Sequence, residues 1–195
     1  MKTNRLIYSL FGIIVMTFIL TPLFTKVRAQ KRPDGEAKTA NKSNPVPKDW
    51  SYVYEKKRGY GFYLPVGSTY EFQTINKLDL LVIKTAEPLD IDIFVLAYKD
   101  KTLTKEDLLV DAVDFLTGLG QKVTPGKLKG ESDNYAVADA TTIIENGQQG
   151  KLRILVGTDV TDNYIMIIGA APQVFDANEK TIDTIWGSFE MWSGR

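Results

Sequence analysis

The side chains that could do chemistry in this sequence are carboxylates, lysines, arginines and tyrosines, because the chain contains neither histidine nor cysteine. That composition excludes thiol catalysis, a histidine-based triad, disulfides and the usual zinc ligand sets. No serine lies in a nucleophile elbow, and no glycine-rich loop fits a phosphate group. The sequence therefore predicts no enzyme, no cofactor and no metal site, although a hydrolase that uses carboxylates stays open as an alternative.

Acidic residues come closest to a site for a hard cation in three places. These are Asp107, Asp111 and Asp114 on one helical stripe, Asp159, Asp162 and Asn163 in one turn, and Asp176 to Glu179. The last stretch lacks the glycine and the twelfth-position glutamate that a calcium loop requires. Carboxylates along a helix more often form its solvent face. We therefore expect these residues to be surface acids rather than ligands.

A dense group of aromatic and basic residues opens the predicted domain and is a candidate docking surface. Aromatic side chains dominate the cores of protein interfaces, and a basic run could meet an anionic partner or a membrane surface. The alternative is a cross-strand aromatic ladder inside a hairpin whose charged tip is solvated. The candidate residues are Trp50, Tyr52, Lys56, Lys57, Arg58 and Tyr60.

The charge of the chain is balanced overall but unevenly distributed. The full sequence holds 24 basic and 24 acidic residues, whereas residues 50–195 hold 15 basic and 21 acidic ones, a net charge of −6. An acidic domain without a basic stripe argues against a nucleic-acid partner. We expect a protein partner instead.

The N-terminal 29 residues resemble a targeting segment. Lys2 and Arg5 precede a nearly unbroken apolar run from Leu6 to Phe24, and Ala29 ends a pattern suited to signal peptidase. We expect cleavage after Ala29, with an uncleaved anchor formed by residues 6–24 as the alternative. In either case the remainder is exported, to the periplasm or the outside, and the segment offers a possible membrane association.

Residues 30–49 carry no apolar side chain larger than valine. Such a segment cannot offset the entropy of ordering itself, so it is predicted to be a flexible linker.

The remaining residues, 50–195, are predicted to form one domain. Alternating apolar residues bounded by turn formers indicate strands at 51–55, 60–65, 69–75, 78–85, 91–98, 122–128, 135–145, 151–160 and 164–171. Thr104 can cap a helix that continues to about Leu119, and Pro172 opens a second helical pattern. In that second pattern Ile182, Ile185, Trp186 and Phe189 share one face, which is expected to be buried. The order of elements predicts an α+β fold, a mostly antiparallel sheet covered by two main helices.

This pattern resembles the superfamily that groups the photosystem II extrinsic protein PsbP with the Mog-type Ran-binding protein and several exported bacterial proteins. The similarity rests on Gly59-Tyr60-Gly61-Phe62-Tyr63-Leu64-Pro65, on the long helix between two blocks of strands, and on the closing Ile185-Trp186-Gly187-Ser188-Phe189. It implies an α/β/α sandwich used mainly as a binding or assembly module. The resemblance to PsbP does not extend to a metal-binding histidine, because the chain has none, and the export signal argues against a nuclear Ran-binding role.

Taken together, the sequence favours an exported, non-catalytic module that acts through protein contacts. The alternative from another class is a carrier that holds a small apolar ligand between sheet and helices, where pockets commonly form.

Overall fold

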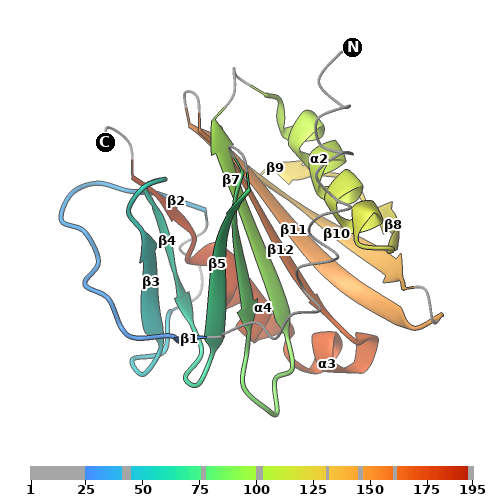
Figure 1. Cartoon of the computed structure of the whole chain (residues 1–195), viewed down its shortest axis with the longest axis horizontal. Coiled ribbons are helices and arrows are strands. Elements are labelled where there is room, and N and C mark those ends of the chain that lie inside the picture. The colour runs from blue at the N-terminus through green and yellow to red at the C-terminus, as the bar shows by residue number, and fades with distance from the viewer. Residues whose placement is uncertain are drawn as a thin grey trace.

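The computed structural model describes residues 25–40, 45–75, 78–99, 103–130, 132–144, 147–159 and 162–192. Within them the strands form two antiparallel sheets, accompanied by three helices (Figure 1). The predicted apolar targeting run up to Phe24 lies outside the described residues. None of the described helices is long and apolar enough to cross a membrane.

The large sheet has nine strands and is antiparallel at every pairing. Its order is β1-β5-β6-β7-β12-β11-β10-β8, with β9 also paired to β10. The strands are β1 (Thr25–Lys26), β5 (Thr69–Ile75), β6 (Leu78–Lys84), β7 (Asp92–Lys99), β8 (Lys122–Pro125), β9 (Lys129–Gly130), β10 (Tyr135–Ile143), β11 (Gln149–Asp159) and β12 (Asp162–Ala170).

The small sheet joins segments that are far apart in the sequence. Its order is β2-β13-β4-β3, with β2 at Lys38–Thr39, β3 at Ser51–Glu55, β4 at Tyr60–Leu64 and β13 at Glu190–Met191. The predicted hairpin of residues 51–64 is confirmed, and its second strand pairs with the C-terminal strand β13. The hairpin is therefore held to the end of the chain rather than to its neighbour in sequence.

Helix α2 (Lys105–Gly118) covers one face of the large sheet (Figure 1). Leu108, Ala112 and Phe115 pack there against the apolar side chains of β10, β11 and β12. The predicted cap is confirmed, since the Thr104 hydroxyl accepts from the backbone N–H of Asp107 while the Asp107 carboxylate accepts from the N–H of Thr104. This reciprocal cap satisfies two helix-terminal donors and fixes where the helix begins.

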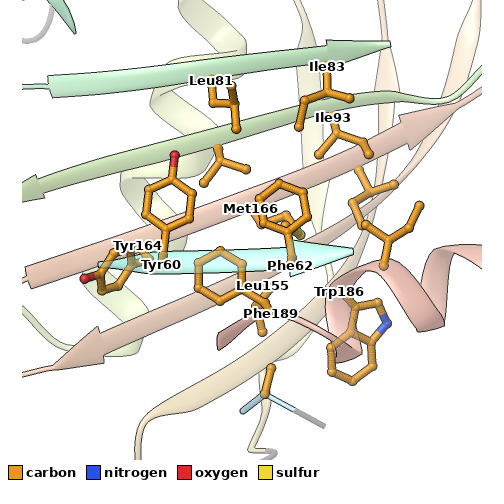
Figure 2. Close-up of a cluster of buried hydrophobic side chains, with 14 of the residues drawn as sticks. Tyr60, Phe62, Leu81, Ile83, Ile93, Leu155, Tyr164, Met166, Trp186 and Phe189 are labelled. Atoms are coloured by element: carbon orange, nitrogen blue, oxygen red, sulfur yellow. The ribbon is translucent and has the colours of Figure 1, made fainter. Parts of the chain in front are cut away.

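The opposite face of the large sheet is covered by the small sheet together with α3 (Pro172–Ala177) and α4 (Glu179–Gly187). Aromatic side chains fill the space between the two sheets (Figure 2). Phe189, which follows α4, stacks on Tyr60 with ring centroids 5.6 Å apart and on Phe62 at 5.9 Å. The cluster joins the hairpin, the large sheet and the C-terminal helices into one core.

The prediction of a sheet covered by two main helices is wrong. One main helix covers one face, and a second sheet with two short helices covers the other. The alternation in residues 51–64 shows that one side of each strand is buried, but it does not show which strand is the partner. The closing helical pattern is divided at Asn178, where φ is −118° and the backbone leaves the helical conformation.

Residues 30–40, the first part of the predicted flexible linker, contact the folded domain. Strand β2 pairs with β13, and Ala40 is buried with its N–H donating to the carbonyl of Phe189 at 2.8 Å. The contacts are mainly polar, which explains why apolar composition did not reveal them. In addition, β1 pairs with β5, so cleavage after Ala29 would remove that strand from the sheet edge.

Trp186 lies in the core, as its place on the apolar stripe predicts. Its side chain is buried in the cluster beneath the small sheet, and its Nε1 donates to Asp183 at 2.9 Å. Trp186→Ala should lower the free energy of unfolding by about 3 kcal/mol, the lower end of the usual range for a large buried aromatic, because the ring reaches the surface at one edge. Urea denaturation measures this loss.

Val110→Ala is the control for the Trp186 measurement. Val110 lies on the solvent side of α2 and is 56% exposed, so its truncation should change stability by less than about 0.5 kcal/mol. A Trp186→Ala loss as small as that of the control would place Trp186 on a docking surface rather than in the core.

Candidate functional site

The six residues of the predicted docking surface do not form one surface. Tyr52 and Tyr60 are buried, and Trp50 is partly buried against the core. The basic residues follow in the turn between β3 and β4, where Lys56 is exposed. Tyr60 thus belongs to the aromatic core, in agreement with the cross-strand interpretation of the aromatic residues.

The end of the basic run turns toward the large sheet. Lys57 Nζ donates to Asp79 Oδ1 at 3.0 Å, and Arg58 Nε donates to Asp79 Oδ2. Asp79 lies on β6 and is fully buried. This contact connects the two sheets, so Arg58 has a structural role in the described fold.

The acidic groups considered as cation sites are engaged in other contacts. Asp107 caps α2, Asp111 accepts from Tyr98, and Asp159 accepts from Lys38 at 2.6 Å. Lys151 donates to both carboxylate oxygens of Asp176. In the described ranges, no three acids come together in an arrangement that could hold a metal ion.

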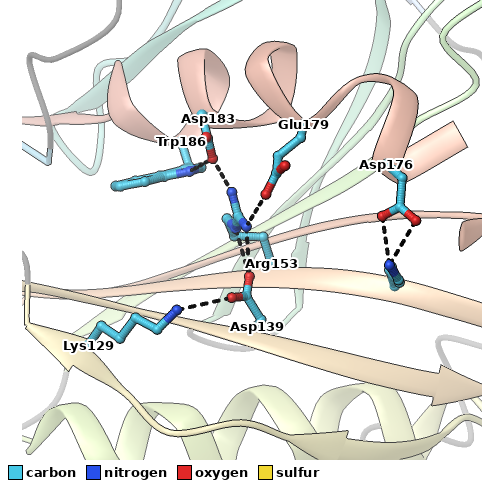
Figure 3. A network of polar contacts seen from close by, with 8 residues as sticks. Lys129, Asp139, Arg153, Asp176, Glu179, Asp183 and Trp186 are labelled. Atoms are coloured by element: carbon cyan, nitrogen blue, oxygen red, sulfur yellow. Dashed lines mark hydrogen bonds and ion pairs between the residues drawn. The ribbon is translucent and has the colours of Figure 1, made fainter.

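An open cleft of about 440 Å³ lies between the β8–β10–β11 part of the large sheet and helices α3 and α4. Arg153 stands at its centre on β11, directly opposite Asp139 on β10 (Figure 3). The cleft is lined by Thr124, Pro125, Gly126, Asp139, Ala140, Thr141, Lys151, Leu152, Arg153, Phe175, Asp176 and Glu179.

Arg153 binds three carboxylates from two layers of the fold (Figure 3). Its Nε donates to Asp139 Oδ1 at 2.9 Å, its Nη2 lies 3.5 Å from Glu179 Oε1, and its Nη1 contacts Asp183 Oδ1. The guanidinium also lies 5.7 Å from the ring centroid of Phe175. A planar guanidinium presents five donors in a fixed fork, so it can bind several carboxylates at once in a defined geometry.

Arg153 and Asp139 keep their charges at neutral pH. Burial alone would lower the pKa of Arg153, but the hydrogen bond to Asp139 and the charges of Asp183 and Glu179 raise it above its ordinary value. Burial would likewise raise the pKa of Asp139, and the hydrogen bonds from Arg153 and Lys129 hold that pKa below its usual range. Neither group is suited to exchange a proton near pH 7.

The chemistry that this arrangement supports is charge recognition. Arg153 is 11% exposed, whereas the side chains of Asp139, Asp176 and Glu179 are more than half exposed, so the cleft presents carboxylate oxygens to solvent. The lining contains three carboxylates and two cations. The cleft is open to solvent and lined by charged groups, so it is not the enclosed apolar cavity expected of a carrier for an apolar ligand.

Sequence reasoning missed this cleft. A two-residue turn at Asn146-Gly147 between the predicted strands 135–145 and 151–160 would place Asp139 opposite Ile154, whereas the observed register places it opposite Arg153. The sequence shows opposite charges on two adjacent strands, but the register that brings them together depends on the turn that forms. The carboxylates of α4 were not predictable either, because their approach depends on how the helix packs.

Comparison with solved structures identifies a similar fold. The solution structure of cyanobacterial PsbP (CyanoP) from Synechocystis sp. PCC 6803 superposes with a TM-score of 0.57 at 16% sequence identity, covering 77% of this chain and 99% of that one. The fold is PsbP-like. This agrees with the resemblance of the glycine-rich hairpin, and at this identity the similarity extends to the fold alone.

No protein-family model matches the chain. No curated protein matches it either.

Proposed function

We propose that this protein is an exported, non-catalytic module that acts through protein contacts, with the cleft around Arg153 as a contact surface. The observation that carries the proposal is the group of partly exposed carboxylates, Asp139, Glu179 and Asp183, that one largely buried guanidinium binds. The chain shares its fold with cyanobacterial PsbP, and this likeness fits a non-catalytic role that depends on protein contacts.

The carboxylates of the cleft fit lysine or arginine side chains of a partner. Asp176 and Glu179 lie on the helical side and are 60% and 63% exposed, so each can accept further hydrogen bonds. Asp139 on β10 lines the same cleft. Such charged groups act mainly on specificity and association rate, which suits a module that must find one partner among many.

The proposal is tested by reversing the charge of the cleft. The double variant Asp176→Lys and Glu179→Lys should reduce recovery of cross-linked partner proteins from the host's envelope fraction by about tenfold or more, since like charges would then face each other across the contact. Quantitative mass spectrometry of the cross-linked material gives the measurement.

The matched control reverses two exposed acids on other parts of the molecule. Glu106 at the start of α2 and Asp133 in the β9–β10 loop are both exposed. Glu106→Lys with Asp133→Lys changes the net charge equally and should leave recovery unchanged. If both double variants lost the same proteins, net charge rather than the cleft would govern binding, and the proposal would fail.

A further inference from the structure

A second surface lies on the outer face of the small sheet, and it shares no residue with the cleft. Residues 30–40, here called the strap, cross this face from the free edge of β3 to β13 at the opposite side (Figure 1). The strap begins where Gln30 N–H donates to the carbonyl of Tyr52 at 3.0 Å, while the Gln30 side-chain oxygen accepts from Tyr54 N–H at 2.9 Å. It ends in β2.

Under the strap lies a receptor for one guanidinium group. Glu190 Oε1 and Oε2 accept from Arg32 Nη2 at 2.6 Å and Nε at 2.8 Å, a two-point contact that matches the planar fork of arginine. The guanidinium also lies 5.1 Å from the ring centroid of Trp192, within the range of a cation–π contact.

The receptor is built by the sheet itself and not by the strap. Trp192 Nε1 donates to the Tyr52 hydroxyl at 3.2 Å, and that hydroxyl donates to Glu190 Oε2 at 3.0 Å. These hydrogen bonds fix the position of the Glu190 carboxylate without any contribution from the strap. Burial raises the pKa of Tyr52, which keeps the hydroxyl a donor. The ring of Tyr52 can cross β4 only because Gly61 has no side chain, since a Cβ there would lie 2.2 Å from the hydroxyl oxygen.

The strap is held firmly at its C-terminal end, where β2 pairs with β13, Lys38 donates to Asp159 at 2.6 Å and the Tyr135 hydroxyl donates to the Lys38 carbonyl at 2.7 Å. Over the outer face it has fewer contacts. Arg32 is its one charged contact with this face among the described residues, and the Arg32 side chain remains 45% exposed. The neighbouring pair of Lys31 and Asp34 is almost fully exposed. Residues 31–36 are therefore the part of the strap that a competing segment could displace, since they bury little apolar surface to offset the entropy of ordering.

From these observations we infer that the outer face of the small sheet is a docking site for an extended segment of a partner protein that carries an arginine, and that the strap occupies this site when the partner is absent. The arginine binds Glu190 and Trp192. The backbone beside it bonds to the open edge of β3, as the backbone of Gln30 does. The strap thereby keeps a partly buried carboxylate and an aromatic ring covered until a competing segment displaces it.

A synthetic peptide with the strap sequence, QKRPDGEAKTA, labelled with a fluorophore, is the probe for this site. In the full chain, Arg32→Ala releases the anchor but leaves the receptor intact. Fluorescence anisotropy should then show the peptide binding about tenfold or more tightly to this variant than to the wild type, because a strap without its arginine competes less strongly for Glu190 and Trp192. Lys31→Ala is the matched control on the strap and should bind the peptide as weakly as the wild type.

Specificity is tested from both sides of the contact. A peptide with alanine in place of its arginine should bind the Arg32→Ala variant at least about tenfold more weakly, as expected when a two-point charged contact is lost. Adding Glu190→Gln to Arg32→Ala should weaken binding of the original peptide similarly. Tyr52→Phe, which removes only the hydroxyl beneath the carboxylate, gives a second receptor variant that should also reduce binding if Glu190→Gln does not fold.

Three outcomes would overturn the inference. Equal binding to wild type and Arg32→Ala would show that the strap does not compete for the site. Binding that ignores both the peptide's arginine and the receptor variants would show a non-specific contact. A wild-type dimer in light scattering that dissociates upon Arg32→Ala would show that the site takes the strap of a second copy instead of a partner's segment.

Discussion

Replacing Phe189 by alanine should lower the free energy of unfolding by about 4–5 kcal/mol, the upper end of the range for buried aromatic residues. Phe189 is completely buried at the point where the small sheet, the large sheet and α4 meet (Figure 2). Its ring stacks on Tyr60 and Phe62 and meets the edges of Tyr135 and Tyr164 at 6.3 and 5.9 Å. The substitution would remove four ring contacts and leave a cavity.

The expected loss comes from the ring alone, because the backbone carbonyl of Phe189 that accepts from Ala40 N–H is unchanged by the substitution. A loss of this size is a large share of the 5–15 kcal/mol that stabilises a typical domain. Urea denaturation followed by tryptophan fluorescence measures it.

Phe72→Ala is the matched control for the Phe189 measurement. Phe72 lies on β5 and is 39% exposed, so its loss should cost about 1 kcal/mol or less. A similar effect for the two substitutions would contradict the view that the aromatic cluster joins the sheets.

Much of the fold could be predicted from the sequence because it depends on local patterns. Alternation in residues 51–55 and 60–64 located the hairpin, and Thr104 located the start of α2. These signals depend on neighbouring residues only. The division into two sheets depends on β13, a strand of two residues whose pairing with β4 no periodicity could reveal.

The functional surfaces were harder to predict because their contacts join distant segments. Arg32 and Glu190 are 158 positions apart, and the strap has the composition of a mobile linker. Composition reports how much apolar surface a segment can bury, but not whether one charged side chain finds a partner on a sheet face. Among the cleft residues, the pairing of Asp139 with Arg153 depends on the register of a hairpin whose turn the sequence does not define. The approach of Glu179 and Asp183 depends on the placement of α4.

The basic run at 56–58 shows the same limit. From sequence it was a solvated hairpin tip or a contact for an anionic partner. In the structure Asp79 binds both Lys57 and Arg58, and Thr74 donates to the same carboxylate at 2.6 Å. The Tyr164 hydroxyl further donates to the carbonyl of Arg58 at 2.6 Å. An aspartate in an otherwise apolar strand could have signalled such a buried pair, because a buried charge requires a partner.

Asp79→Asn should therefore lower the free energy of unfolding at pH 7 by about 3–5 kcal/mol, the usual effect of breaking a buried ion pair by removing one member. Asparagine keeps the shape but removes the charge, and leaves Arg58 without the carboxylate that it contacts across the sheets. Asp133→Asn, at an exposed position in the β9–β10 loop, is the control and should change stability by less than about 0.5 kcal/mol.

The effect of Asp79→Asn should depend on pH in a defined direction. Burial alone would raise the pKa of Asp79, but the hydrogen bonds from Thr74, Arg58 and Lys57 outweigh it and hold the pKa below its ordinary value. The unfolded chain then binds a proton more readily than the folded one, so the charge of Asp79 stabilises the fold above about pH 4 and ceases to do so as the pH falls through the lowered pKa. Urea titrations at pH 7 and pH 3 should show the difference between wild type and Asp79→Asn shrinking at the lower pH. A difference that stayed constant, or grew, would mean that the shape of the side chain and not its charge holds the two sheets together.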